Sequence, residues 1–125
     1  MFNFSGSRPD NLGVNNGKLA VCPNSPNCVN SQSNDEKAKI DPLPAVPISQ
    51  LKAIVESMER TKIITETDNY LYAEFASKLM GFVDDVEFYL DRDAGVTHVR
   101  SASRLGQSDL GVNRARVQEI RAKLV

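Results

Sequence analysis

The sequence of 125 residues has no tryptophan, one histidine and two cysteines. A structural zinc site needs four ligands, usually cysteine and histidine, so these three residues cannot complete one within a single chain. Fifteen lysines and arginines nearly balance sixteen aspartates and glutamates, and the strongly basic face of a general nucleic-acid-binding protein is therefore missing. We expect no metal, no other cofactor and no nucleic acid among the ligands.

Long apolar runs are also lacking. No stretch approaches the roughly 20 apolar residues that span a bilayer. The first residues, MFNFSGSRPDNLG, have neither the basic start nor the apolar run of a signal peptide. These observations predict a cytoplasmic protein without a membrane span. The length and a hydrophobic content of 41% predict one domain, residues 1–125, with a single core.

Proline is absent after residue 47, although the chain contains six prolines. Proline removes backbone donors and disfavours helix in the residue before it. Residues 1–47 are therefore predicted to form an extended arm that wraps the domain. Two short apolar pieces of this arm, residues 19–21 and Val29, could each form an edge strand.

Residues 48–125 are predicted to form an α-β-β-β-β-α core. A first helix is expected from near Ser49 to near Arg60, because apolar residues there recur at the helical spacing i, i+3, i+4 and i+7. A final helix is expected from about Val112 to Lys123. Between them, four runs with strand-like alternation predict an antiparallel meander, with the C-terminal helix packed on one face of the sheet. The fold class is thus α+β.

The register of the last hairpin can be predicted from charge and hydrophobicity. Pairing Phe88 with Val99 also pairs Glu87 with Arg100, so that apolar residues meet on one face and opposite charges meet on the other. In this register Asp84 lies on the apolar face and needs polar partners, whereas Glu87 is expected on the exposed face.

The segment Arg100 to Arg116, RSASRLGQSDLGVNRAR, forms the predicted corner between the last strand and the final helix. Backbone N–H groups at such a corner can hold anions. We expect Asp84 to contact a serine or backbone N–H and either Arg104 or Arg114. The competing interpretation is that aspartates neutralise the arginines internally. The candidate ligand- or partner-binding residues are Asp84, Arg100, Ser101, Ser103, Arg104, Ser108, Asp109, Asn113 and Arg114.

Three motifs resemble the uncharacterised "domain of unknown function 1499" family. They are CPNSPNCV, FVDDVEF and RSASRLGQSDLGVNR, in that order, and the resemblance extends over nearly the whole chain. A further family signature, Pro-Leu-Gly, is looser here because Asp10 and Asn11 separate Pro9 from Leu12. The resemblance implies one domain. The family has no settled activity, so the resemblance implies no mechanism, ligand or catalytic residues.

Cys22 and Cys28 flank the turn-rich segment PNSPN. We predict that their Cα atoms lie within about 4.4–6.8 Å, the range of disulfide geometry. Three states remain open: two buried thiols that pin the arm, a reversible redox pair, or a permanent disulfide outside the cytosol.

Two catalytic interpretations fail on strand geometry. A serine triad would need His98, which lies on the opposite face of the strand from Ser101. Asp84 and Asp85 are neighbours and also point to opposite faces, so they do not form a paired-carboxylate site.

The sequence therefore favours a non-enzymatic binding or accessory module that uses the polar corner. Its partner would be an unknown protein or a small anionic ligand. The alternative is a small enzyme acting on an anionic substrate, with Asp84 or Asp109 as base and Arg104 or Arg114 as anchor.

Overall fold

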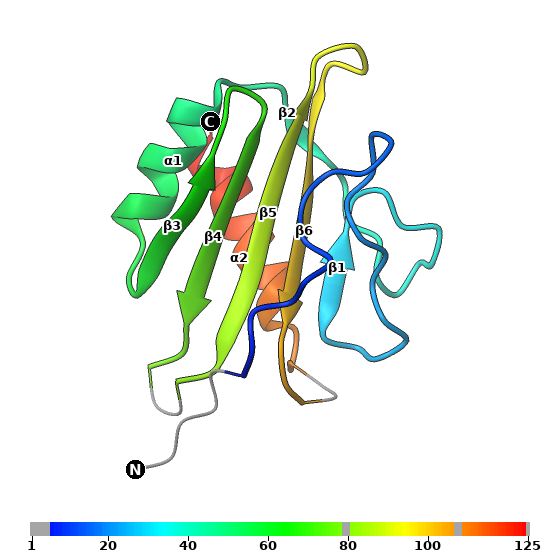
Figure 1. Ribbon diagram of the computed structural model, residues 1–125, viewed down its shortest axis with the longest axis vertical. Coiled ribbons are helices and arrows are strands. Elements are labelled where there is room, and N and C mark those ends of the chain that lie inside the picture. The colour runs from blue at the N-terminus through cyan, green and yellow to red at the C-terminus, as the bar shows by residue number, and fades with distance from the viewer. Residues whose placement is uncertain (1–5, 79–80, 107–108, 125) are drawn as a thin grey trace.

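The computed structural model describes residues 6–78, 81–106 and 109–124 (Figure 1). Within these residues, six strands form one sheet and two helices accompany it. The elements are β1 (Cys28–Asn30), β2 (Leu43–Pro44), α1 (Ile48–Ser57), β3 (Thr61–Glu66), β4 (Tyr70–Ala76), β5 (Val83–Asp91), β6 (Val96–Ser103) and α2 (Val112–Lys123).

The predicted meander is confirmed as β3 to β6, which pair antiparallel in the order β6-β5-β4-β3. The arm extends the sheet, because β1 and β2 both pair with β6. Val29 thus lies in an edge strand, as expected for one of the two short apolar pieces of the arm. The predicted hairpin register is also confirmed, with Phe88 opposite Val99 and Glu87 opposite Arg100.

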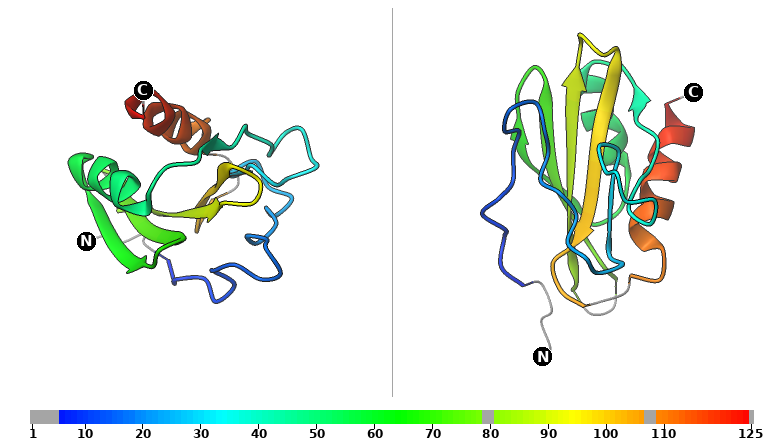
Figure 2. Two further views of the ribbon diagram at one scale, coloured as in Figure 1. Left: turned by 90° about the horizontal axis from the view of Figure 1, so that it is seen from above. Right: turned by 90° about the vertical axis from the view of Figure 1, so that its right-hand side faces the viewer.

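Both helices cover the same face of the sheet and enclose the core (Figure 2). Phe88 and Leu51 are fully buried there, and Val117 and Ile120 of α2 close the core from the other helix. The alternation of β5 places Val86 and Phe88 on this inner face. The α+β prediction, with the final helix on one face, is therefore confirmed.

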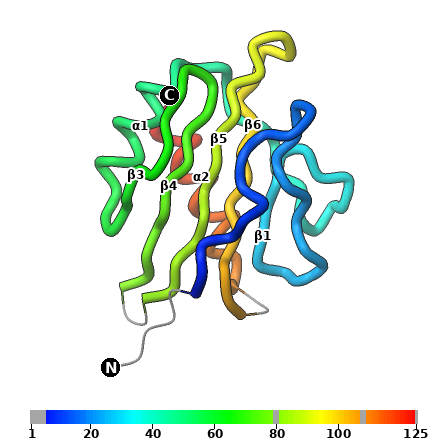
Figure 3. Tube along the Cα trace, viewed as in Figure 1, coloured from blue at the N-terminus to red at the C-terminus, as the bar shows by residue number. Residues whose placement is uncertain are grey.

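The opposite, outer face of the sheet is covered by the first part of the arm, residues 6–22. This segment runs across β5 and β6 on the side away from the helices (Figures 2 and 3). The prediction that Glu87 is exposed is therefore wrong: this segment covers the outer face, and Glu87 is fully buried. The strand alternation was correct, but the outer face of this sheet is not open to solvent.

Candidate functional site

The corner between β6 and α2 is built around the side chain of Asn113, in the first turn of α2. Its amide oxygen accepts hydrogen bonds from Ser101 Oγ (2.6 Å) and Arg116 Nη1 (2.8 Å). Its amide nitrogen donates to the backbone oxygen of Asn27 (3.1 Å) and to Ser103 Oγ (2.9 Å). Asn113 is fully buried, so this one side chain ties the arm, the sheet and the helix together.

Asp109 occupies the N-terminus of α2, where an anionic ligand was expected. Its carboxylate accepts the backbone N–H groups of Gly111 (2.8 Å) and Asn113 (3.1 Å). Although burial raises the pKa of Asp109, hydrogen bonds from Asn113 and Gly111 outweigh it and hold the pKa below its ordinary value. The chain therefore supplies its own anion to this helix end.

Asp84 has an arginine partner, but not one of the two that were predicted. It pairs with Arg116, at 2.8 Å between Oδ2 and Nη2. Ser101 and Ser103 bond to Asn113 rather than to Asp84. Arg116 also lies over the ring of Phe75, with Cζ 4.8 Å from the centroid. The ion pair thus joins β5 to α2 on the inner face.

Strand and helix geometry explains the wrong prediction. Arg104 lies four residues after Arg100, so the strand alternation directs both side chains to the outer face of the sheet. The side chain of Arg104 therefore lies away from Asp84. Arg114 instead donates to the backbone oxygen of Lys37 (3.1 Å). Arg116 lies three residues after Asn113 and therefore shares the sheet-facing side of α2 with it.

A second polar cluster lies on the outer face, centred on Asp85 and Arg104. The guanidinium of Arg104 holds Asp85 through Nε (2.9 Å) and Nη2 (2.8 Å) and also contacts Glu74 (2.6 Å). Tyr72 donates its hydroxyl to Asp85, and burial together with that bond raises the pKa of Tyr72. Asp84 and Asp85 thus serve opposite faces, as predicted, and each has its own arginine.

Glu87 and Arg100 form the third charged group, and they are the most buried of the three. One carboxylate oxygen of Glu87, Oε2, accepts the hydroxyl of Tyr70 and the backbone N–H of Gly13 (2.7 Å). Arg100 Nη1 lies 3.9 Å from the other oxygen, Oε1. Burial raises the pKa of Glu87 and lowers that of Arg100. Glu87 Oε1 and Arg100 Nε are buried and have no hydrogen-bond partner among the described residues.

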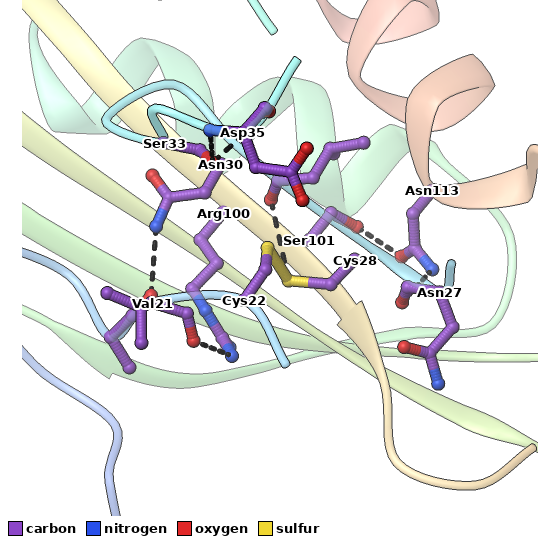
Figure 4. Close-up of a disulfide and its surroundings, with 12 residues drawn as sticks. Val21, Cys22, Asn27, Cys28, Asn30, Ser33, Asp35, Arg100, Ser101 and Asn113 are labelled. Carbon is purple, nitrogen blue, oxygen red and sulfur yellow. Dashed lines mark hydrogen bonds between the residues drawn. A yellow bond between two sulfur atoms is a disulfide. The ribbon is translucent and has the colours of Figure 1, made fainter. Parts of the chain in front are cut away.

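The cysteine prediction is confirmed, because Cys22 and Cys28 form a disulfide with Cα atoms 5.6 Å apart (Figure 4). The bond joins the end of the arm segment to β1. Beside it, Arg100 Nη2 reaches the backbone oxygen of Val21 (3.3 Å). The disulfide therefore fastens the arm next to the buried Glu87–Arg100 pair.

A pocket of about 280 Å³ opens beside the corner, at the start of β5 and the end of β6. Asp84, Ser103 and Asp109 contribute to its wall, but most of its lining is apolar. The apolar lining residues include four that are exposed at its rim: Phe82, Leu105, Leu110 and Val112. Nothing in the sequence indicated that these four residues line a pocket, because the exposure of an apolar side chain is known only from the fold around it.

The remaining candidates do not form a catalytic group. His98 contacts Ser31 Oγ through Nδ1 (3.1 Å), whereas Ser101 bonds to Asn113 on the inner face. Ser108 lies outside the described residues. In the part of the chain that the structure describes, no cluster of three or more metal-ligating side chains occurs. Among the same residues, no helix has the length and apolar character needed to cross a membrane.

The fold and the corner define a small α+β protein in which Asp84, Asp85 and Glu87 each lie beside an arginine of the same chain. The chain belongs to the family described as "Protein of unknown function (DUF1499)", whose model matches residues 18–124. This confirms the resemblance carried by the three motifs. No curated protein and no solved structure matches the chain.

Proposed function

We propose that this protein is a non-enzymatic binding module, a single domain whose partner-contacting surface is the pocket beside the corner. The observation that carries the proposal is Leu110, at the pocket rim. It has a positive φ of 55° and is 93% exposed. A left-handed backbone is unfavourable for leucine, and so is the exposure of its side chain to water. Strained, exposed residues of this kind cluster at functional sites.

The chemistry of the pocket supports a protein partner over a small anion. A volume of about 280 Å³ is at the lower limit for small-molecule sites and suits an apolar side chain of a partner protein. Asp84 and Asp109 are the acidic residues of its described lining, and neither favours an anion. Of the arginines that were expected to bind one, Arg104 is engaged with Asp85 and Glu74, Arg100 lies beside Glu87, and Arg114 donates to a backbone oxygen.

The same contacts argue against the enzyme alternative. A general base needs a carboxylate that is free to take a proton from a substrate. Asp84 is held by Arg116, and Asp109 accepts hydrogen bonds at the start of α2. The two arginines predicted to hold an anionic substrate also have partners already, since Arg104 binds Asp85 and Arg114 donates to a backbone oxygen.

Two substitutions test the pocket with little risk to the fold. Leu110→Asn suits a left-handed backbone, and Val112→Asp places an acid in the first turn of α2, where it is favourable. The probe is the neutral apolar dye Nile red. The parent should enhance its fluorescence, and the doubly substituted protein should reduce its affinity about fivefold or more, as loss of apolar contacts worth about 1 kcal/mol implies.

Val21→Asp is the matched control, because Val21 is 83% exposed and lies outside the pocket. It should bind the dye like the parent. Equal dye binding by all three proteins, or no binding by the parent, would reject the pocket as the working surface.

The cytoplasmic location stays a prediction, and the disulfide argues against it. Cytosolic thiols are kept reduced, whereas disulfides persist in oxidising compartments. Alkylation of free thiols in intact cells of the native host decides the question. Rapid labelling of Cys22 and Cys28 would support the cytosol, and protection until a reductant is added would support an oxidising compartment.

A further inference from the structure

The arm segment, residues 6–22, is held on the outer face in an unusual way. Among these residues only Leu19 is buried, and most of the other side chains face solvent. An ordinary surface segment would be anchored by several apolar side chains. This segment instead contributes mainly its backbone to the contact.

Side chains of the sheet and of the residues next to β1 recognise that backbone directly. Glu87 accepts the N–H of Gly13 (2.7 Å), and Arg100 donates to the C=O of Val21 (3.3 Å). Asn30 donates to the C=O of Ala20 (2.9 Å). Gln32 makes two more such bonds, accepting the N–H of Leu19 and donating to the C=O of Gly17 (2.9 Å each). Five side-chain-to-backbone bonds therefore hold the segment, whose path includes a tight turn closed by two backbone bonds between Asn15 and Lys18 (2.8 and 3.0 Å).

One side chain of the segment is also recognised, at its far end. Arg8 donates through Nε (2.9 Å) and Nη2 (2.7 Å) to Glu74 Oε2. Its guanidinium lies 5.9 Å from the centre of the Tyr72 ring. A carboxylate beside an aromatic face is a suitable receptor for an arginine.

The face also has polar atoms that the arm does not use. Glu87 Oε1 and Arg100 Nε are buried beneath the segment and have no hydrogen-bond partner in the described part of the chain. Buried orphan groups of this kind cost free energy, and in most proteins they are paired. An acceptor and a donor thus remain for a different occupant.

We propose that the outer face is a peptide-binding site that the chain's own arm occupies, and that its ligand is a peptide segment that carries an arginine and makes the same tight turn as residues 15–18. Backbone N–H and C=O groups are common to all sequences, so another chain that has glycine at the positions of Gly13 and Gly17, where φ is positive, can take the same place. The family match covers residues 18–124, so Leu19, Ala20 and Val21 of the segment lie inside the matched part, whereas Arg8 and Gly13 precede it.

The experiment uses the full chain with a weakened arm and supplies the native arm in trans. Arg8→Glu removes the pair with Glu74, and Leu19→Ser removes the apolar anchor. The probe is a fluorescein-labelled peptide of residues 6–21, followed by fluorescence anisotropy. It should bind the weakened chain at least about tenfold more tightly than the parent, whose own arm competes at the high effective concentration of a tethered segment.

Two controls distinguish recognition from general stickiness. Asp10→Ser with Lys18→Ser changes two exposed arm side chains that form no hydrogen bond or ion pair among the described residues, so this chain should reject the peptide as the parent does. A peptide carrying the Arg8→Glu and Leu19→Ser changes should bind the weakened chain about tenfold less tightly than the native peptide. Equal binding of both peptides, or equal binding by the weakened and control chains, overturns the proposal.

Circular dichroism establishes whether the weakened chain is folded. If Leu19→Ser unfolds it, Arg8→Glu alone serves, because the Arg8 side chain is 50% exposed and lies outside the core. That chain should bind the native peptide about threefold more tightly than the parent, as expected for one exposed ion pair. Binding no tighter than the parent's would then refute the proposed site.

Discussion

The pair between Asp84 and Arg116 should be a major stabilising contact between β5 and α2. Their side chains are 11% and 13% exposed, and the charged atoms lie 2.8 Å apart. Removing one partner of a buried pair typically costs about 3–5 kcal/mol. Arg116 would keep its bonds to Ser101 and Asn113 and its place over the Phe75 ring. We therefore expect Asp84→Asn to lower the free energy of unfolding by about 2–3 kcal/mol.

A double-mutant cycle with Arg116→Met tests the attribution. Methionine keeps apolar packing against Phe75 but removes the charge, so the double variant should recover about 1–2 kcal/mol relative to the sum of the single changes. The assay is urea unfolding followed by far-ultraviolet circular dichroism, because the chain has no tryptophan to report by fluorescence.

The exposed pair between Arg92 and Asp68 is the matched control. Its charged atoms are 3.9 Å apart and its side chains are 60% and 85% exposed. The corresponding cycle there should give a coupling below about 0.5 kcal/mol. If the Asp84–Arg116 changes are also additive within about 0.5 kcal/mol, the pair does not fasten α2 to the sheet.

Three further predictions follow from the core, the buried carboxylate and the disulfide. Phe88→Ala should cost about 3–5 kcal/mol in urea unfolding, because its side chain is fully buried, and a cost under 1 kcal/mol would contradict the assigned inner face. Since burial raises the folded-state pKa of Glu87, its carboxyl stabilises the fold at low pH and loses that contribution as pH rises through the folded pKa. From pH 4 to pH 7, the free energy of unfolding of Glu87→Gln should therefore rise relative to that of the parent. A difference between the two proteins that stays constant or falls over this range would refute the raised pKa. Reducing the bond between Cys22 and Cys28, which closes a loop with a sequence separation of 6, should cost about 2 kcal/mol and lower Tm by about 5–10 °C in differential scanning calorimetry. An unchanged Tm would mean that the disulfide does not stabilise the arm.

The local sequence pattern was enough to predict most of the secondary structure and the pairing of the last two strands. The final helix lies at Val112–Lys123, as the sequence indicated. The β5–β6 register followed from matching Phe88 with Val99 and Glu87 with Arg100, because a slip of one residue would exchange the two faces of the strand. These features depend on side-chain period and on neighbours across one turn, which are properties of the sequence itself.

The functional surface depended on contacts between distant segments. Glu87 was placed on the correct face, but only the path of the arm decides that this face is buried. The candidates for the Asp84 partner were close in the chain, whereas the helical rotation of α2 selects Arg116. The disulfide requires the close approach of Cys22 to Cys28 at the start of β1, with Cα atoms 5.6 Å apart.

What the sequence by itself determined was therefore the four-stranded meander, the two helices, the inner face of the sheet and the family, whereas residues 19–21 form no strand and β2 was not expected. Only the tertiary structure decided which partner each polar side chain contacts. Pairing between charges depends on distances across the fold, and those distances are set by how the arm and α2 pack on opposite faces of the sheet. The apolar pocket rim and the backbone contacts beneath the arm have no counterpart in local sequence pattern for the same reason.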